Sequence, residues 1–336
     1  MEHITIGTSN LETSRIGLGT WAIGGWMWGG TDEKASVATI RRAVDRGVTL
    51  IDTAPVYGFG RSEEIVGKAL AEGGLRKRVT IATKVGLSWE NGRPFRDCRP
   101  ARIRQEIEDS LKRLRTDVID LCQVHWPDPE TPIAETARAL ERARREGKIR
   151  AIGVSNYTPA QMAVFGPSAK LDAVQPPYNL FERQIEADVL PHAVGAGLTV
   201  LSYGALCRGL LSGGMTVRST FPGDDLRNVD PKFQGERFRQ YLAAVDELRK
   251  LARDRFGKSV LALAVRWVLD QGPTIALWGA RRPEQLDPID EIDGWHVDDA
   301  AQREIDAILQ RCIPDPVSPA FMAPPDRSRA PECSIV

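Results

Sequence analysis

The sequence predicts an α/β fold in which eight parallel strands, each followed by a helix, close into a (β/α)8 TIM barrel. Short apolar, β-branched runs alternate with charged helical stretches along the chain, which is typical of repeated βαβ units. Eight such runs are present, and most are continuously apolar, as strands covered on both faces are. The 336 residues suit one barrel of about 250 residues with insertions. We therefore expect a single domain over residues 1–336.

The predicted elements follow one another in a regular order after an opening hairpin at residues 4–14. The eight strands are expected at residues 16–19, 49–53, 79–84, 118–124, 151–155, 173–175, 199–203 and 274–278. Amphipathic helices with charged outer faces are expected at residues 33–46, 62–71, 100–114, 133–146, 159–165, 182–194 and 259–271, and from residue 283 onward.

Three segments are longer than ordinary connections between strands and helices. They are residues 85–99 after the third strand, residues 207–235 after the seventh, and the proline-bearing tail at 313–336. Long loops without their own structure are usually lids or binding loops, and in barrels the loops after strands lie on the active face. We expect substrate selectivity in residues 85–99, around residues 221–227, and in the tail.

The composition excludes several classes of protein. The formal net charge is zero and no basic tract is interleaved with aromatic residues, so a nucleic-acid partner is not expected. The five cysteines are scattered without a C-x-x-C pair or metal-ligand spacing, which indicates free thiols in a reducing compartment and no metal. Glu2 stands where a signal peptide carries basic residues, and no apolar stretch approaches about 18 residues. We therefore expect a cytoplasmic protein that binds no membrane.

Two short patterns suggest other assignments that their context does not support. The last four residues, Cys333 to Val336, have the form of a prenylation box, but no polybasic segment precedes them, so no lipid anchor is expected. The glycine pairs at 58 and 60 and at 195 and 197 resemble parts of a dinucleotide-binding fingerprint. The first pair lacks the third glycine and the second precedes a strand, so no Rossmann unit is predicted.

Ionisable residues stand at the carboxyl ends of three consecutive predicted strands. Asp52 ends the second strand, Lys84 the third and His125 the fourth. Adjacent parallel strands lie about 4.8 Å apart, so these side chains can converge. Tyr57 follows Asp52 in a loop that Pro55 stiffens, and glycines beside it allow a sharp turn back over the strand ends.

These four residue types together form a tuned general acid. A phenol with a pKa of about 10 is a poor acid at neutral pH unless its anion is stabilised. A cation at about 4 Å is worth roughly 4 kcal/mol at an effective dielectric of 20, so Lys84 would lower the pKa of Tyr57. Asp52 would hold the ammonium, and a neutral His125 would donate a hydrogen bond to a substrate carbonyl.

The residues around this group resemble the aldo-keto reductase family. Residues 47–67 (GVTLIDTAPVYGFGRSEEIVG) are similar to the first signature of that family. The resemblance continues over nearly the whole chain, from about residue 16 to residue 285, and is nearest to bacterial NADPH-dependent reductases of the general-stress type. Further matching motifs are GGWMWGG at 24–30, ATK at 82–84, QVHWP at 123–127, GVSNY at 153–157, QPPYN at 175–179, RGLL at 208–211 and LWGAR at 277–281.

The resemblance assigns a role to each matching residue. The catalytic tetrad would be Asp52, Tyr57, Lys84 and His125. Independently of the resemblance, Trp21, Trp26, Trp28 and Trp126 cluster after the first and fourth predicted strands, where they could line an aromatic substrate pocket.

For the cofactor, NADPH or NADP+, the resemblance implies a longer set of contacts. Ser155, Asn156 and Gln175 would bind the nicotinamide amide, and Tyr203 would stack on the nicotinamide ring. The full set is Gly19, Thr20, Trp21, Asp52, Ser155, Asn156, Gln175, Tyr203, Leu206, Arg208, Gly279, Arg281 and Gln285.

The preference for NADPH has support from the residues themselves. Arg281 and Arg282 follow the eighth strand at the start of a helix, where exposed N–H groups and the helix dipole attract phosphate. A 2′-phosphate there would favour NADPH over NADH. The chain departs from many relatives at two positions, since Gln285 replaces an arginine and Ile289 replaces an asparagine that contacts adenine.

The expected function is NADPH-dependent reduction of small aldehydes or ketones, with Tyr57 as the general acid, by a monomer or small homo-oligomer. Two alternatives stay open. One is a regulatory barrel without catalysis that binds NADPH as a sensor, as the potassium-channel β subunits of this family do. The other is oxidation of a sugar or alcohol with NAD by the same tetrad.

Overall fold

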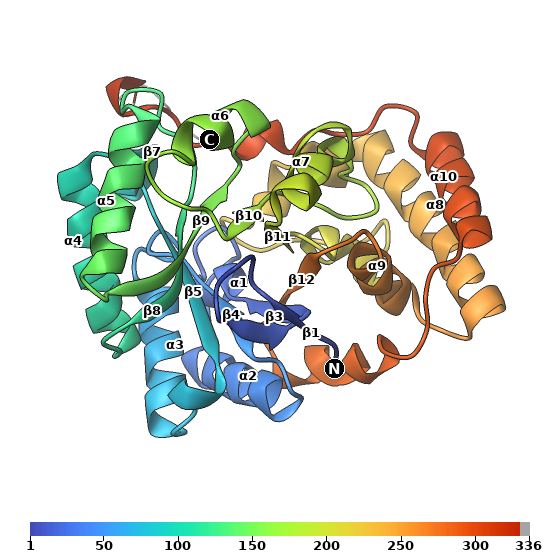
Figure 1. Ribbon diagram of the computed structural model, residues 1–336. Helices are drawn as coiled ribbons and strands as arrows, with labels where there is room; N and C mark the ends of the chain where they lie inside the picture. Colours follow the sequence, from blue (N-terminus) through green and yellow to red (C-terminus); the bar gives the residue numbers. More distant parts are fainter. Residues whose placement is uncertain (330–336) are drawn as a thin grey trace.

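The computed structural model describes residues 1–329, and its centre is a closed barrel of eight parallel strands (Figure 1). Around the barrel the strands follow the order β3, β4, β5, β8, β9, β10, β11 and β12, and β12 pairs with β3 to close it. The predicted (β/α)8 barrel is confirmed. The strands are β3 (Ile16–Gly19), β4 (Leu50–Asp52), β5 (Thr80–Val85), β8 (Ile119–Val124), β9 (Ile149–Ser155), β10 (Ala173–Gln175), β11 (Thr199–Ser202) and β12 (Thr274–Gly279).

Helices surround the barrel, and most lie where the apolar periodicity predicts them (Figure 1). Several begin directly after a residue whose side chain accepts a hydrogen bond from a backbone N–H group of the first turn. These residues are Asp32, Thr158 and Ser259. The helices that follow barrel strands are α2 (Glu33–Asp45), α3 (Arg61–Glu72), α4 (Pro100–Leu114), α5 (Ile133–Arg145), α6 (Pro159–Phe165), α7 (Val189–Ala196) and α9 (Val260–Leu269).

Three α-helices were not predicted, and two others differ from the prediction. The first is the four-residue α1 (Trp21–Gly24), directly after β3. α8 (Gly235–Leu251) and α10 (Asp299–Cys312) pack against each other outside the barrel (Figure 1). The helix expected at 182–194 is split at Asp188, where the backbone leaves helical geometry between a short 3-10 turn and α7. The helix expected from residue 283 is the 3-10 segment η7 (Pro283–Glu291), which contains Pro288.

Two antiparallel hairpins lie at opposite ends of the barrel, the first at the amino ends of the strands and the second beside the pocket. The predicted N-terminal hairpin is present as β1 (His3–Thr5) and β2 (Glu12–Ser14). The segment at 85–99, expected to be a loop without its own structure, contains a hairpin of β6 (Leu87–Glu90) and β7 (Arg93–Arg96), so that expectation was wrong. Asn91 and Gly92 at its tip have positive φ, which suits a tight two-residue turn.

The barrel interior is apolar in the middle and polar at the carboxyl ends of the strands. Above a buried apolar layer, the strands carry Asp52, Lys84, Gln123 and Gln175, all at most 2% exposed. The barrel is thus a packed core whose upper layer presents charged and amide groups. The apolar layer consists of Leu50, Ala82, Leu121, Ala151, Ala173, Leu201, Ile275 and Leu277.

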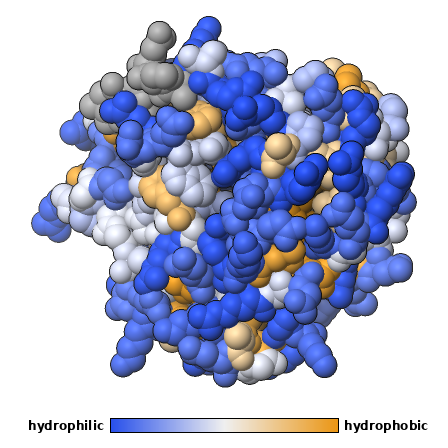
Figure 2. Space-filling view, turned by 90° about the vertical axis from the view of Figure 1, so that its left-hand side faces the viewer, coloured by the Kyte–Doolittle hydropathy of each residue, from blue (hydrophilic) through white to orange (hydrophobic). Residues whose placement is uncertain are grey.

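The described part of the tail returns across the open end of the barrel. Asp326 lies 2.6 Å from Arg96 on β7, and Arg327 lies 3.0 Å from Glu130, so the tail is tied to the side of the barrel that carries the β6–β7 hairpin. The tetrapeptide 333–336 lies outside the described residues. Among residues 1–329 no helix is long and apolar enough to cross a membrane. Figure 2 shows a mostly hydrophilic face over α4 and α5, with small separated apolar patches.

Candidate active site

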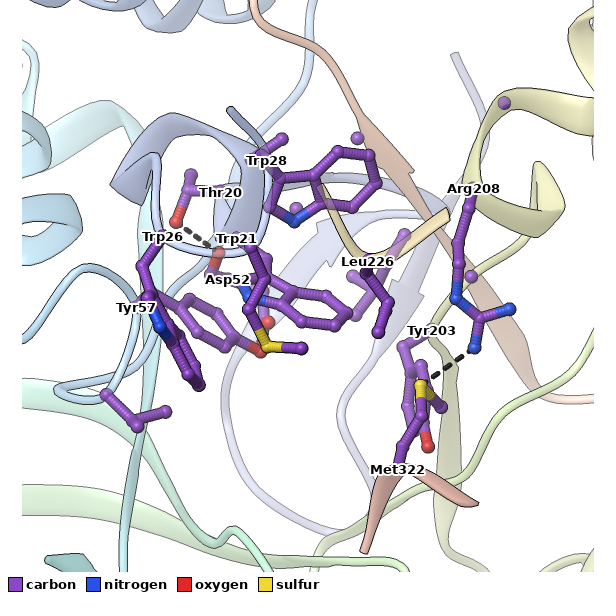
Figure 3. Close-up of a pocket in the computed structure, with 18 of the residues that line it drawn as sticks. Thr20, Trp21, Trp26, Trp28, Asp52, Tyr57, Tyr203, Arg208, Leu226 and Met322 are labelled. Atoms are coloured by element: carbon purple, nitrogen blue, oxygen red, sulfur yellow. Dashed lines mark hydrogen bonds between the residues drawn. The ribbon is translucent and has the colours of Figure 1, made fainter. Parts of the chain in front are cut away.

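A pocket of about 690 Å³ opens at the carboxyl ends of the barrel strands. Tyr57 and Trp21 lie on one side of it, and Tyr203, Arg208 and Met322 lie on the other (Figure 3). Every predicted site residue lines this pocket except Lys84, which is buried beneath Tyr57. The predicted residues in the lining are Gly19, Thr20, Trp21, Asp52, Tyr57, His125, Trp126, Ser155, Asn156, Gln175, Tyr203, Leu206, Arg208, Gly279, Arg281 and Gln285.

The four residues of the predicted tetrad lie together at the bottom of the pocket. The Lys84 ammonium donates to Asp52 Oδ1 at 2.6 Å, to the Thr53 carbonyl at 3.1 Å and to the Tyr57 hydroxyl at 3.2 Å. The Tyr57 ring meets the His125 ring edge to face, with centroids 5.7 Å apart. A buried ion pair therefore presents its cation directly to one phenol.

The loop that carries Tyr57 is held by close backbone contact. Gly58 has a φ of 65°, and a Cβ there would lie 2.1 Å from the Gly24 carbonyl oxygen. In return, a Cβ on Gly24 would lie 2.6 Å from the Tyr57 carbonyl group. The Trp21 ring stacks on the Tyr57 ring with centroids 5.9 Å apart. These glycines let two chain segments touch, which directs the phenol back toward Lys84.

The pKa of Tyr57 differs from the expectation that Lys84 would lower it, whereas that of His125 agrees with the expected neutral imidazole. Burial raises the pKa of Tyr57 above its ordinary value; the charge of Lys84 lowers it, but this effect does not compensate for burial. Burial and then Lys84 hold the pKa of His125 well below its usual range. At neutral pH the phenol is therefore protonated and the imidazole neutral. A donor hydroxyl and a neutral hydrogen-bonding ring are what a general acid and a carbonyl-orienting group require.

The raised pKa of Tyr57 makes a direct prediction. We expect no Tyr57-dependent phenolate absorption in the free protein below a pH of about 10, since a raised pKa keeps the hydroxyl protonated up to and beyond the ordinary value. Ultraviolet titration of wild type against Tyr57→Phe measures this. A difference that appears between pH 7 and 9 would show that Lys84 outweighs burial after all.

Amide and hydroxyl groups at the ends of β9 and β10 form a connected set. The Ser155 hydroxyl donates to the Gln175 carbonyl at 2.7 Å, and the Asn156 amide donates to Ser155 Oγ and to the His125 carbonyl, each at 3.0 Å. The Tyr203 hydroxyl donates to Asn156 Oδ1 at 2.9 Å. Asn156 has a φ of 60°, which asparagine tolerates better than most residues. The three side chains expected to bind one amide are thus brought together.

A family model described as the aldo/keto reductase family matches residues 15–309. The chain belongs to the aldo-keto reductase family. It is 60% identical over 328 residues to aldo-keto reductase YhdN of Bacillus subtilis (strain 168), covering 97% of this chain and 99% of that protein. It is 37% identical over 302 residues to the NADH-specific methylglyoxal reductase of Escherichia coli (strain K12), covering 85% of this chain and 91% of that protein.

Two solved structures of the family are similar over nearly their whole length. The glycerol dehydrogenase AKR11B4 from Gluconobacter oxydans has a TM-score of 0.87 at 57% identity and covers 96% of this chain and 99% of its own. The holo form of aldo-keto reductase AKR11C1 from Bacillus halodurans has a TM-score of 0.75 at 27% identity, with 92% and 96% covered. The family and fold expected from the sequence motifs are therefore confirmed.

In this aldo-keto reductase the phosphate site expected after β12 is arranged differently. The Gln285 side-chain oxygen accepts the backbone N–H groups of Arg281 at 2.8 Å and Arg282 at 3.0 Å. The Arg281 guanidinium donates to the carbonyls of Trp28 and Gly30. The expected free amides at this helix start are thus capped from within the chain. Arg282, 3.1 Å from Glu284, is the most exposed of the arginines that line the pocket.

Arg208, expected to contact the cofactor, belongs to a buried charge cluster that the sequence did not reveal. Its guanidinium lies 3.0 Å from Asp230 and 3.4 Å from Glu182, and the fully buried Lys232 lies 2.9 Å from Glu182. The Arg208 guanidinium also donates to the Met322 sulfur at 2.7 Å (Figure 3). Because these residues come from distant segments, no sequence spacing indicates the cluster.

A second feature missed by the sequence reasoning is a bridge over the pocket. Asp224 accepts the backbone N–H groups of Met27 at 2.8 Å and Gly29 at 2.9 Å, and the Leu226 N–H donates to the Met27 carbonyl at 2.9 Å. The Arg227 guanidinium lies 5.2 Å from the Trp28 ring centroid. The segment after β11 thereby contacts the loop after β3 across the opening of the pocket.

Proposed function

We propose that this protein reduces small aldehydes and ketones to alcohols with NADPH, and that Tyr57 is the proton donor. The observation that carries the proposal is the Tyr57 hydroxyl, which lines the pocket and lies 3.2 Å from the Lys84 ammonium. Its raised pKa keeps it protonated at neutral pH, as a donor to a carbonyl oxygen must be. The glycerol dehydrogenase and the methylglyoxal reductase support a small, polar substrate for this chain.

The residues fit a nicotinamide cofactor. The pocket lining extends from the tetrad to Arg282, and Tyr203, Asn156 and Gln175 are part of it. When bound, the cofactor supplies the hydride for the carbonyl carbon. We infer that Asn156 and Gln175 hold its amide, that Tyr203 supports its ring, and that the bridge through Asp224 keeps it enclosed.

Side chains of the protein would donate the proton and stabilise the group that it leaves. A carbonyl oxygen between Tyr57 and His125 accepts hydrogen bonds from the phenol and the neutral imidazole, which polarise the carbonyl. As negative charge develops on that oxygen, the phenol proton moves to it. Lys84 stabilises the phenolate, by roughly 4 kcal/mol at about 4 Å and an effective dielectric of 20. Asp52 keeps the ammonium in place, since it is bonded at 2.6 Å.

A substrate and cofactor panel tests the proposed function. Turnover with NADPH and a set of small aldehydes is compared with turnover with NAD or NADP+ and glycerol, other alcohols and sugars. We expect kcat/KM to be highest for NADPH with an aldehyde. Higher kcat/KM for alcohol oxidation would favour the second candidate, a dehydrogenase, which the similarity to a glycerol dehydrogenase supports. Absence of turnover in both directions would favour an NADPH sensor.

We infer that the proposed preference for NADPH depends on Arg282, the most exposed arginine of the pocket lining. We expect Arg282→Ala to raise KM for NADPH about tenfold and to leave KM for NADH within about twofold, because only NADPH carries a 2′-phosphate for a charge-assisted bond. Arg253→Ala, which removes an exposed arginine remote from the pocket, is the matched control. Equal effects of Arg282→Ala on both cofactors would contradict this role.

A further inference from the structure

We propose that Gln123 is a positioning residue for the tetrad: with Gln175 it clamps one oxygen of Asp52, so that the other oxygen holds Lys84 beneath Tyr57. This inference rests on the proposed function of Tyr57. Gln123 lies at the end of β8, is fully buried, and is not among the residues that line the pocket. It therefore acts through its neighbours and not on a substrate.

The two oxygens of Asp52 have separate partners. Oδ1 accepts from the Lys84 ammonium at 2.6 Å. Oδ2 accepts from the side-chain amide of Gln175 at 2.8 Å and from that of Gln123 at 3.2 Å. The Gln175 amide also donates to Gln123 Oε1 at 3.2 Å, which joins the two amides. A carboxylate offers only acceptors, so the nitrogen ends of both amides must face Asp52.

This clamp sets the direction of the Gln175 side chain. With its nitrogen committed to Asp52 and Gln123, the carbonyl oxygen of the Gln175 amide is the end left for the pocket, which Gln175 lines. Gln123 thus supports two groups at once, namely the carboxylate that holds Lys84 and the amide proposed to contact the cofactor. Buried polar networks of this kind keep a single geometry only while every donor and acceptor in them has a hydrogen-bond partner.

A glycine on the neighbouring strand provides independent support. Gln123 pairs in register with Lys84 on β5 and with Gly153 on β9. Gly153 does not have a positive φ, so its backbone conformation is open to other residues. A Cβ at that position would lie 3.0 Å from Gln123 Cγ and 3.2 Å from the Ala173 carbonyl oxygen. Glycine weakens a strand, and here its missing side chain is the space that Gln123 occupies.

Two substitutions at position 123 separate positioning from packing. Gln123→Met keeps the approximate volume and removes both hydrogen bonds. Gln123→Glu keeps the shape, and its protonated form still donates to Asp52. Once that carboxyl group ionises, two carboxylates face each other and the clamp fails. The charged and titratable groups around this point are Asp52, Lys84, Tyr57 and His125.

The experiment is kcat for aldehyde reduction between pH 5 and 9 in wild type and both variants, at saturating NADPH and aldehyde. We expect Gln123→Met to lower kcat about tenfold at every pH, with KM for the aldehyde within about twofold of wild type. Gln123→Glu should approach the wild-type kcat at low pH. As the pH rises, the kcat of this variant should fall about tenfold relative to that of wild type at the same pH. Leu121→Met, one layer below on the same strand, should behave as wild type.

A wild-type kcat for Gln123→Met, or a pH profile of Gln123→Glu parallel to that of wild type, overturns the proposal. Recovery of Gln123→Glu at low pH shows that this variant is folded. A second test replaces Gly153 with alanine: kcat should fall about tenfold in the wild-type background and by a smaller factor in Gln123→Ala, which removes the Cγ atom nearest to the added methyl group and keeps only the contact with Ala173. Equal losses in both backgrounds contradict the pairing. If the proposed function itself fails, wild type and Tyr57→Phe will have the same rates.

Discussion

Tyr57→Phe is expected to lower kcat for aldehyde reduction about a thousandfold while NADPH binds with nearly unchanged affinity. The substitution removes one hydroxyl and almost no volume, and general acids contribute roughly 10² to 10⁴ to a rate. Because Lys84 and Asp52 remain paired without the hydroxyl, the fold should be unaffected. Steady-state kinetics and a fluorescence titration of NADPH measure the two quantities.

The matched control for this substitution is Tyr157→Phe. Tyr157 is a buried core residue that packs on Phe165 with ring centroids 6.2 Å apart, and it does not line the pocket. It should keep the wild-type kcat within about threefold, which is within the range of ordinary core changes. Undiminished turnover in Tyr57→Phe would refute the proposed proton donor.

Lys84→Met is expected to abolish measurable turnover and, unlike Tyr57→Phe, to destabilise the protein by about 3–5 kcal/mol. Removing one partner of a buried ion pair leaves an uncompensated charge, and both side chains here are at most 3% exposed. Urea unfolding of the variant and of wild type measures this difference.

A control for the stability effect is an exposed ion pair. Lys250→Met removes a partner of Glu247 at the surface, and such pairs contribute about 0–1 kcal/mol. If Lys84→Met unfolds at the same urea concentration as wild type, the buried pair does not carry the stability assigned to it. Loss of turnover without loss of stability would also indicate that Asp52 finds another partner.

The two substitutions together distinguish the roles inside the tetrad. In the proposed function Tyr57, at the pocket surface, would act on the substrate, so its loss should affect rate alone. Lys84, which lies beneath it, would act on the phenolate and on the fold, so its loss should affect both. The pKa of His125 lies well below its usual range, so the imidazole is neutral. We therefore expect no loss of activity from protonation of His125 near pH 6.5.

Local patterns along the chain were sufficient to predict the barrel and the proximity of the four residues of the proposed tetrad. Apolar β-branched runs and amphipathic helices report burial directly, because each strand is covered by its own following helix. Asp52, Lys84 and His125 were predictable because the carboxyl ends of parallel strands meet at one edge. The motif around Tyr57 added the phenol, and Gly58 beside it is required by a close backbone contact.

Other parts of the site could not be predicted, since they depend on contacts between distant segments. Gln285 fills the helix start where free amides were expected, because its side chain folds back on its own turn. Asp224 reaches the loop after β3 from the segment after β11, across a large sequence separation. The raised pKa of Tyr57 likewise could not be predicted, because it follows from burial of the phenol in the folded protein.

The sequence by itself determined where the eight barrel strands run, which strand ends carry charge and to which family the chain is related. Those properties follow from periodicity and from motifs a few residues long. Only the tertiary structure decided how the buried groups share hydrogen bonds: Gln123, Gln175 and Gly153 stand on three neighbouring strands, and their relation to Asp52 exists once the register is set. Hydrogen bonds form over about 3 Å, a distance that only the closed barrel brings within reach.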